Sequence, residues 1–360
     1  MVTTPEHPVI VVGAGQSGLA AARACRDAGL QPIVLEAGDR PSGSWPHYYD
    51  SLRLFSPARY SAMPDLPLDG DPDRYPTRNE LADYLDRYAQ HLGVDIRTHT
   101  RVTAVEADGA TFIVHTADGG SLRAAGLIAA SGSFGNPTVP NLPGQDTFTG
   151  ELLHVAGYRT PAPYAGKRVI VVGGGNSGVQ IADELTNVAD LTLATLAPIS
   201  FLPQITRGHD LHHWLDVTRF DHLPAAWLRH IVRKPLVLDT GRYRESIETG
   251  RIHRRAMFTA FDGDTVVWPD GRREPVDTVI FATGYRPDVD YLRPLGALDD
   301  DGLPLHADGI STTHPGLAYL GLEFQRSFSS NTVRGVSRDA EHVVQPLAAH
   351  VQQAPATIGL

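Results

Sequence analysis

Two glycine loops, each directly after a short apolar stretch, constrain this sequence more than any other feature. The first is Gly13-Ala14-Gly15-Gln16-Ser17-Gly18, after residues 8–12. The second is Gly173-Gly174-Gly175-Asn176-Ser177-Gly178, after residues 168–172. In a strand–loop–helix unit the first glycine makes the tight turn, the second lets the backbone approach a pyrophosphate, and the third lets the helix pack on its strand. The phosphates then lie at the amino terminus of that helix. Two such loops predict two bound dinucleotides and electron transfer between them.

The residue at the end of the second strand of each unit predicts which nucleotide binds. In the first unit a helix over about 17–27 and a strand over 32–35 lead to Glu36. An acid here accepts hydrogen bonds from ribose hydroxyls and repels a 2′-phosphate, so the first site is predicted for FAD or NAD and not NADP. The alternative, a solvated strand-end charge, fits the spacing less well. In the second unit a helix over 177–187 and a strand over 191–196 lead to Leu196, which is neither acid nor base.

The length and the order of the units predict the domain organisation. A chain of 360 residues suits two domains with separate cores. A further buried strand is expected late in the chain, at 276–281, after the second glycine loop. We therefore expect an α/β fold with two Rossmann-like domains, the second inserted into the first. The expected FAD-binding domain covers 1–155 plus 278–360, and the expected NAD(P)H-binding domain covers 165–277.

The composition excludes some classes of binding partner and indicates the cell compartment. The net charge of −10 argues against nucleic acid as a partner. No apolar run approaches the roughly 20 residues that span a bilayer, and the amino-terminal residues lack the apolar core of a signal peptide. The only cysteine, Cys25, excludes an intrachain disulfide and a C-x-x-C redox pair. These features predict a cytoplasmic enzyme that binds neither nucleic acid nor membrane.

The segments outside the two nucleotide units are predicted in less detail. A turn-rich loop at 41–46 and a proline-dense loop at 51–75 precede a helix over about 79–91. Strands are expected at 98–105, 111–116, 126–130 and 317–320, and a last helix at 336–350. Two of the expected strands end in small residues that suit backbone passing close to a ligand, and these are Ala130-Ser131-Gly132 and Ala282-Thr283-Gly284.

The segment 201–240 resembles an insertion without a sharp pattern. Its His209, His212 and His213 are expected on one helical face, where they could bind a metal. A packed or solvated helix face is the stronger interpretation, because no pattern of carboxylates or cysteines accompanies them. No metal is assigned.

The residues before the second glycine loop resemble a known family. Phe148, Gly150, His154, Tyr158 and Arg159 fit F-x-G-x-x-x-H-x-x-x-(Y/F)-(K/R), which is similar to the fingerprint of flavin-containing monooxygenases. The Tyr-Arg ending looks like that group and not like Baeyer–Villiger monooxygenases, which usually carry tryptophan there. The strings SGSW, YYDSLRL, GGGNSG and IFATGY extend the resemblance over nearly the whole chain. The layout is most similar to short bacterial members and to the plant auxin-forming monooxygenases.

The resemblance implies cofactors and a reaction. FAD would lie on Gly13, Gly15, Gly18 and Glu36, with Ser44 and Trp45 along the isoalloxazine and Val102 near the adenine. NADPH, with NADH not excluded, would lie on Gly173, Gly175 and Gly178. The reduced flavin would add O₂ to form the 4a-hydroperoxide, which gives one oxygen atom to a heteroatom or carbonyl of a small organic substrate. His154 and Arg159 would orient the cofactor or, equally, link the domains. The expected cofactor-binding set is completed by Gln16, Ser17, Ser131, Asn176, Ser177, Thr283 and Gly284. No catalytic side chain is assigned, and self-association into a homo-oligomer is left open.

Two departures from the family pattern affect these expectations. Many members carry an arginine at the strand end where this chain has Leu196, so we expect a preference for NADPH below ~100-fold unless Arg207 or Arg159 substitutes. Animal-type members place an asparagine beside the flavin near Phe55, although the plant-like members also lack it.

Two other classes of function compete with the monooxygenase. The first is a flavoprotein reductase or oxidase without substrate oxygenation. The second is a non-catalytic flavoprotein, which the intact second loop disfavours. Disulfide reductases are excluded because the paired cysteines are missing.

Overall fold

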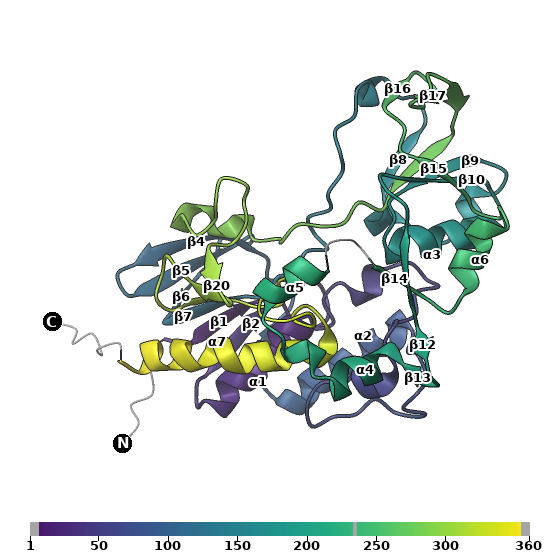
Figure 1. Cartoon of the computed structure of the whole chain (residues 1–360). Helices are drawn as coiled ribbons and strands as arrows, with labels where there is room; N and C mark the ends of the chain where they lie inside the picture. The colour runs from purple at the N-terminus through teal and green to yellow at the C-terminus, as the bar shows by residue number, and fades with distance from the viewer. Residues whose placement is uncertain (1–6, 233–235, 354–360) are drawn as a thin grey trace.

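The computed structural model describes residues 7–232 and 236–353. Residues 1–6, where no signal peptide is expected, lie outside the described part. Two β-sheets, each covered on both faces, form the two halves of the molecule, and α5 (Ala225–Ile231) lies between them (Figure 1). No helix among the described residues is long and apolar enough to cross a membrane.

The first half is built on a seven-stranded sheet of order β20-β21-β22-β7-β1-β2-β3. Its interior strand β1 (Val9–Val12) is fully buried and pairs in parallel with β2 and β7, as expected for a strand covered on both faces. The other strands are β2 (Pro32–Leu35), β3 (Asp95–Arg97), β7 (Gly126–Ala129), β20 (His306–Ala307), β21 (Ile310–Ser311) and β22 (Leu317–Tyr319).

Helices cover one face of this sheet and a second sheet covers the other. One core cluster joins the helices α1 (Gln16–Asp27), α2 (Arg78–Leu92) and α7 (Val333–Gln353). On the opposite face lie the antiparallel strands β4 (Val102–Asp108), β5 (Thr111–Thr116) and β6 (Ser121–Ala124), together with η7 (Asp290–Leu295). Helix α2 begins at a capping box, in which Thr77 and Glu80 satisfy each other's backbone amides.

The second half is built on a five-stranded parallel sheet of order β15-β10-β9-β19-β8. One face of this sheet is covered by α3 and α6, and the other face by a three-stranded antiparallel sheet. The parallel strands are β8 (Glu151–His154), β9 (Arg168–Val172), β10 (Asp190–Thr195), β15 (His253–Ala256) and β19 (Thr278–Phe281). The covering elements are α3 (Asn176–Leu185), α6 (Arg242–Glu248), β16 (Ala260–Asp262), β17 (Thr265–Val267) and β18 (Arg273–Pro275).

The sheet pairings confirm an α/β fold with two Rossmann-like halves, and they place two strands on the other side of the expected domain limits. Strands β8 and β19 were expected in the FAD-binding domain, but both pair within the second sheet, β19 lying between β9 and β8. The late strand at 278–281 therefore completes the second half and does not return the chain to the first. We propose that the chain crosses between the halves at about 136–150 and again at about 282–288.

Two other expectations require correction. The single strand expected at 98–105 is wrong, because β3 ends at Arg97, His99 has a positive φ of 52°, and β4 starts at Val102. The patternless 201–240 insertion instead carries several short elements, too short for a periodicity to show. They are β11 (Ser200–Pro203), β12 (Ile205–Thr206), β13 (His209–Asp210), α4 (Leu211–Val217), η6 (Phe220–His222), α5 (Ala225–Ile231) and β14 (Leu236–Asp239). Residues 233–235 of that insertion lie outside the described part.

Candidate functional site: two glycine loops on one cavity

In the first loop, two of the three glycines are required by the fold itself. Gly13 has a φ of 98°, and a Cβ there would lie 2.7 Å from the Ala130 carbonyl oxygen. A Cβ on Gly18 would overlap the Gly13 carbonyl, so this glycine lets α1 approach β1. Gly15 differs, because among the described residues a Cβ there would meet only Gly43 Cα, at an ordinary 3.5 Å. The space in front of Gly15 is thus open at the amino terminus of α1, where a pyrophosphate fits.

The second loop repeats this arrangement. Gly173 has a φ of 134°, and a Cβ there would overlap the Ala282 carbonyl. A Cβ on Gly178 would overlap the Gly173 carbonyl, while one on Gly175 would meet no atom of residues 7–232 and 236–353 within 4 Å. No contact among these described residues therefore explains the middle glycine, and the open space beside it fits a second pyrophosphate. The side-chain oxygen of Asn176 accepts from the Leu238 amide at 3.0 Å and ties this loop to β14.

Glu36 lies at the end of β2 and is 9% exposed. Its Oε2 accepts from the Ala14 amide at 2.6 Å and its Oε1 from the Gly38 amide at 2.7 Å. These two bonds fix the carboxylate beside the first loop. Each oxygen keeps a further lone pair that could accept from a ribose hydroxyl, so the residue fits the role predicted for it.

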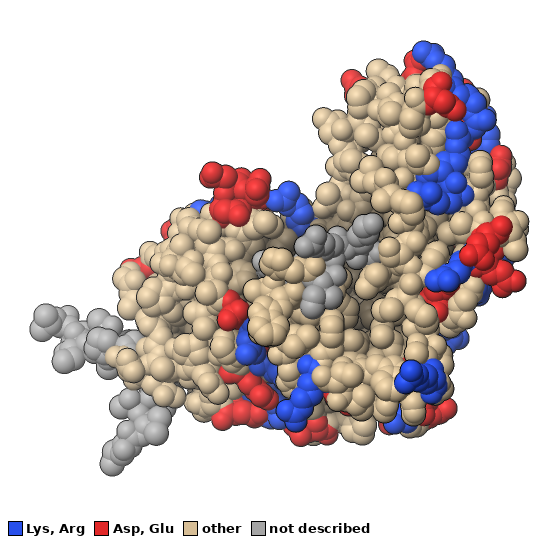
Figure 2. Space-filling view, in the orientation of Figure 1, with Lys and Arg blue, Asp and Glu red and all other residues tan. Residues whose placement is uncertain are grey.

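One cavity of about 1110 Å³ joins the two loops. The surface of the molecule is hollowed between its two halves in the same view as the ribbon (Figure 2). Most of the predicted cofactor-binding residues line this cavity: Gly13, Gly15, Gln16, Ser17, Glu36, Ser44, Trp45, Val102, Ser131, Gly175, Asn176, Ser177, Gly178 and Gly284. The predicted residues outside its lining are Gly18, His154, Arg159, Gly173 and Thr283.

Four aromatic residues that contact one another, Trp45, Tyr48, Phe134 and Tyr285, form an aromatic wall of this cavity. The Tyr48 and Phe134 rings meet edge to face at 4.8 Å, and Phe134 stacks on Tyr285 at 5.5 Å. Trp45 packs against Tyr48 at 5.5 Å, and its indole donates to Gln16 Oε1 at 2.8 Å. Sequence reasoning did not assign Tyr48, Phe134 or Tyr285 to the site. Two of them belong to quoted strings, YYDSLRL and IFATGY, whereas no local pattern marks Phe134.

His154 and Arg159 bind backbone carbonyl groups at or next to the residues of this aromatic wall and do not line the cavity. His154 Nδ1 accepts from the Ala156 amide at 3.1 Å, and Nε2 donates to the Gly284 carbonyl at 3.1 Å. That pattern requires a neutral imidazole, and burial lowers the pKa of His154 below its ordinary value. Arg159 donates to the Tyr48 carbonyl at 2.8 Å. Both roles expected for these residues, orienting the cofactor and linking the domains, stay predictions.

Ser131 and Thr283, the predicted residues that follow two of the strands, also form hydrogen bonds to backbone carbonyl groups. Ser131 donates from Oγ to the Asp288 carbonyl at 2.5 Å, and Thr283 donates to the Thr138 carbonyl. Both fix the segments that cross between the two halves. Their contact with a cofactor stays a prediction.

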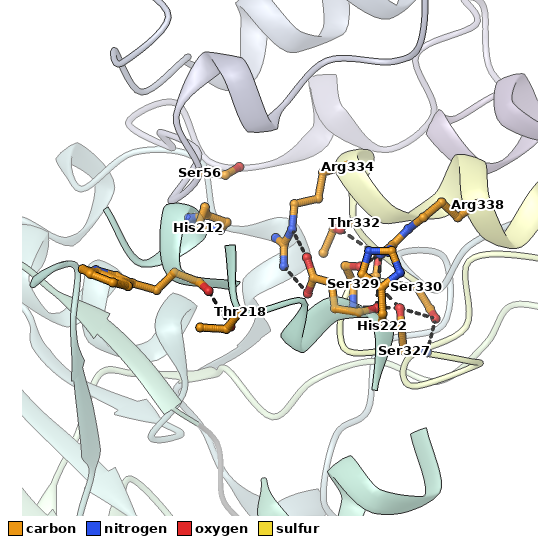
Figure 3. A network of polar contacts seen from close by, with 12 residues as sticks. Ser56, His212, Thr218, His222, Ser327, Ser329, Ser330, Thr332, Arg334 and Arg338 are labelled. Atoms are coloured by element: carbon orange, nitrogen blue, oxygen red, sulfur yellow. Dashed lines mark hydrogen bonds and ion pairs between the residues drawn. The ribbon is translucent and has the colours of Figure 1, made fainter. Parts of the chain in front are cut away.

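The amino terminus of α7 closes one side of the cavity and is anchored to the 211–231 segment. Arg334 lines the cavity and makes two bonds to Asp221, from Nε at 2.8 Å and from Nη2 at 2.9 Å. The two side chains are 10% and 9% exposed. One helical turn later, Arg338 donates to Ser329 Oγ at 2.8 Å and contacts His222 Nε2 at 2.9 Å (Figure 3). No sequence pattern pointed to the contacts with the 211–231 segment, because Asp221 and His222 lie more than 100 positions from their arginine partners.

The three histidines of the insertion do not form the expected face. His209 belongs to β13, because α4 begins only at Leu211. His212 is buried and contacts Asp210 Oδ1 at 2.6 Å, while the His209 and His213 rings stack at 4.2 Å. Within residues 7–232 and 236–353, no group of three histidine, cysteine or acidic side chains could hold a metal ion.

Comparison with known proteins places this geometry in a family. Residues 10–198 match the family model described as pyridine nucleotide-disulphide oxidoreductase. An uncharacterized oxidoreductase CzcO-like of Geobacillus kaustophilus is 30% identical over 95% of this chain and 98% of its own. The indole-3-pyruvate monooxygenase YUCCA1 of Oryza sativa is 30% identical over 94% of this chain and 90% of its own. The structure of a flavin-containing monooxygenase from Stenotrophomonas maltophilia is 31% identical, with a TM-score of 0.83, over 96% of this chain and 98% of that one. With both nucleotide loops intact on one cavity, the chain belongs to the flavin-containing monooxygenase family of FAD- and NADPH-dependent oxidoreductases.

Proposed function

We propose that this protein is a monooxygenase that uses NADPH and bound FAD to insert one oxygen atom of O₂ into a small organic substrate. One observation carries the proposal: the open spaces beside Gly15 and Gly175 line the same cavity. Two nucleotides held there would share one cavity. In keeping with the composition, we retain a cytoplasmic location as part of the proposal.

The first loop would hold FAD and the second NADPH. Glu36 favours the first assignment, because a carboxylate repels a 2′-phosphate and accepts from an unmodified ribose. When bound, FAD would supply the redox chemistry, taking a hydride from the nicotinamide and activating O₂. The chain's own contribution is to bind and orient the nucleotides and to exclude bulk water. The braced residues Gln16 and Trp45 suit that task, because Gln16 also donates to the Asn331 carbonyl at 2.9 Å.

The substrate is proposed to be a small molecule with a heteroatom or carbonyl group that accepts oxygen. Apolar side chains that line the cavity beside the insertion, Leu54, Phe55 and Tyr60, suit an apolar body. Phe55 is 41% exposed, and its ring stacks against the buried His212. The rice relative named an indole-3-pyruvate monooxygenase supports the carbonyl type.

The alternative is a flavoprotein reductase or oxidase that has the same two nucleotide loops and transfers no oxygen. A dithiol mechanism is not part of it, because Cys25 is the only cysteine of the chain. Its thiol is buried in the α1 core, and burial raises its pKa to about 12.

An isotope experiment separates the two functions. Purified protein with bound FAD is given NADPH, ¹⁸O₂ and a panel of small sulfides, amines, ketones and 2-oxo acids. A monooxygenase yields a product carrying one ¹⁸O atom, with NADPH oxidation that the substrate accelerates. NADPH oxidation at an unchanged rate over the whole panel, with no labelled product, would support the reductase or oxidase.

A further inference from the structure

The strand end that usually selects between NADPH and NADH carries no charge in this protein. Strand β10 ends at Thr195, and the next side chain, Leu196, is 94% exposed. A 2′-phosphate is a dianion that needs a guanidinium or ammonium group beside it. A base for this phosphate must therefore come from another element, and one candidate lies on the strand next to β10.

The neighbouring strand β15 supplies two arginines that face opposite ways. Arg254 pairs in register with Leu193, and Arg255 pairs with Ala194. Arg255 lies on the Trp268 side of the sheet, with its Cζ 3.6 Å from the centre of that ring and Nη1 2.7 Å from Glu274 Oε2. Successive strand residues point to opposite faces. Arg254 accordingly lies on the other face, the one that α3 covers.

Arg254 is connected to the second glycine loop through a single side chain. Its Nε donates to Thr195 Oγ1 at 2.8 Å. Thr195 in turn packs on the loop, because a Cβ on Gly174 would lie 3.5 Å from Thr195 Cγ2. The guanidinium is thus held at the carboxyl end of β10, next to the loop whose middle glycine is open. Its two Nη groups are not used in the bond to Thr195.

Arg254 also differs from the neighbouring arginines in that no carboxylate of the described residues pairs with its positive charge. Arg242 and Arg251 both pair with the buried carboxylate of Asp183, and Arg255 pairs with Glu274. For Arg254, no carboxylate lies within 4.0 Å in the described part of the chain. Its positive charge is therefore not neutralised locally, although the side chain is half-buried. Such a group favours an anionic ligand.

We propose that Arg254 reads the 2′-phosphate of NADPH and determines the preference of the enzyme for NADPH over NADH. The proposal rests on the proposed function only in placing the nicotinamide cofactor at the second loop. It replaces the expectation of weak discrimination, which followed from Leu196 alone. A guanidinium presents two parallel N–H donors to a phosphate, and the bond from Nε to Thr195 orients them in advance.

The test measures equilibrium binding, independently of turnover. NADP⁺, NAD⁺ and the fragments adenosine 2′,5′-bisphosphate and ADP are titrated into the FAD-loaded enzyme by calorimetry. Arg254→Gln should weaken NADP⁺ and adenosine 2′,5′-bisphosphate about 10- to 100-fold, the range for a bond to a charged group. It should leave NAD⁺ and ADP within about twofold. Arg254→Lys should recover part of the loss, because it keeps the charge without the paired donors.

The control is Arg242→Gln, in helix α6 of the second half. Arg242 is 62% exposed, and when its charge is removed Asp183 still pairs with Arg251. This variant should leave the ratio of NADP⁺ to NAD⁺ affinity unchanged. An Arg254→Gln enzyme that keeps its flavin and its wild-type ratio overturns the proposal, as does an equal loss of NADP⁺ and NAD⁺. If the wild type binds neither nucleotide, the placement of the cofactor at the second loop fails instead.

Discussion

Replacing Asp221 by asparagine should destabilise the protein strongly, because it leaves a buried guanidinium without a counter-charge. Asp221 and Arg334 are 9% and 10% exposed and join the 211–231 segment to the start of α7. Solvent screening is small at that exposure. Removing one partner of a buried pair costs about 3–5 kcal/mol of the free energy of unfolding. With a slope of roughly 1–3 kcal/mol per molar urea, the unfolding midpoint should fall by about 1 M or more.

A double variant separates the lost pair from the unpaired charge. Asp221→Leu with Arg334→Met removes both charges and keeps apolar volume, so it should recover most of the lost stability. The assay is urea unfolding followed by tryptophan fluorescence. The reasoning is refuted if Asp221→Asn unfolds at the wild-type urea concentration. It is also refuted if the double variant is less stable than the single one.

Three further predictions follow from individual contacts. Gly15→Val should fold, because of the described atoms only Gly43 Cα lies near the new Cβ, but it should lose flavin. Absorbance near 450 nm per protein measures the loss, and full flavin content would contradict the assignment. Burial lowers the pKa of His154, so the unfolded chain binds the proton more readily than the folded one. The free energy of unfolding should therefore decrease as the pH falls below about 6.5. His154→Asn should flatten this decrease in urea titrations at pH 5–8, and an unchanged slope would argue against this role of His154. Leu196→Arg should recover part of the NADP⁺ affinity lost in Arg254→Gln, as calorimetry can show.

The parts of the fold that follow from local sequence were predicted well. Residues 9–35 form the expected strand–helix–strand unit, and the second unit agrees to within two residues at each end. Both units depend on glycines whose need is local: a positive φ at Gly13 and Gly173, and close helix packing at Gly18 and Gly178. Such requirements are visible in a single sequence.

What could not be predicted depends on pairing between distant segments. Strand β19 could pair with either sheet on its apolar sequence alone, and only the folded chain shows it beside β9. The ion pair between Asp221 and Arg334, and the bond from Arg254 to Thr195, join residues on different elements. An arginine in a sequence carries no sign of whether a carboxylate neutralises it. The missing base at Leu196 was therefore visible, whereas the candidate replacement on β15 was not.

The most direct test of two nucleotides in one cavity is anaerobic reduction of the bound flavin in Gly175→Ala. The described part of the chain leaves room for this methyl group, since none of its atoms lies within 4 Å of the new Cβ. Flavin absorbance is followed after rapid mixing with NADPH, and separately with dithionite. The account predicts that the flavin content and the dithionite reaction stay at wild-type levels, while reduction by NADPH needs at least about tenfold more NADPH or slows by that factor. Reduction by NADPH at the wild-type rate and concentration dependence would contradict the placement of the nicotinamide cofactor at the second loop.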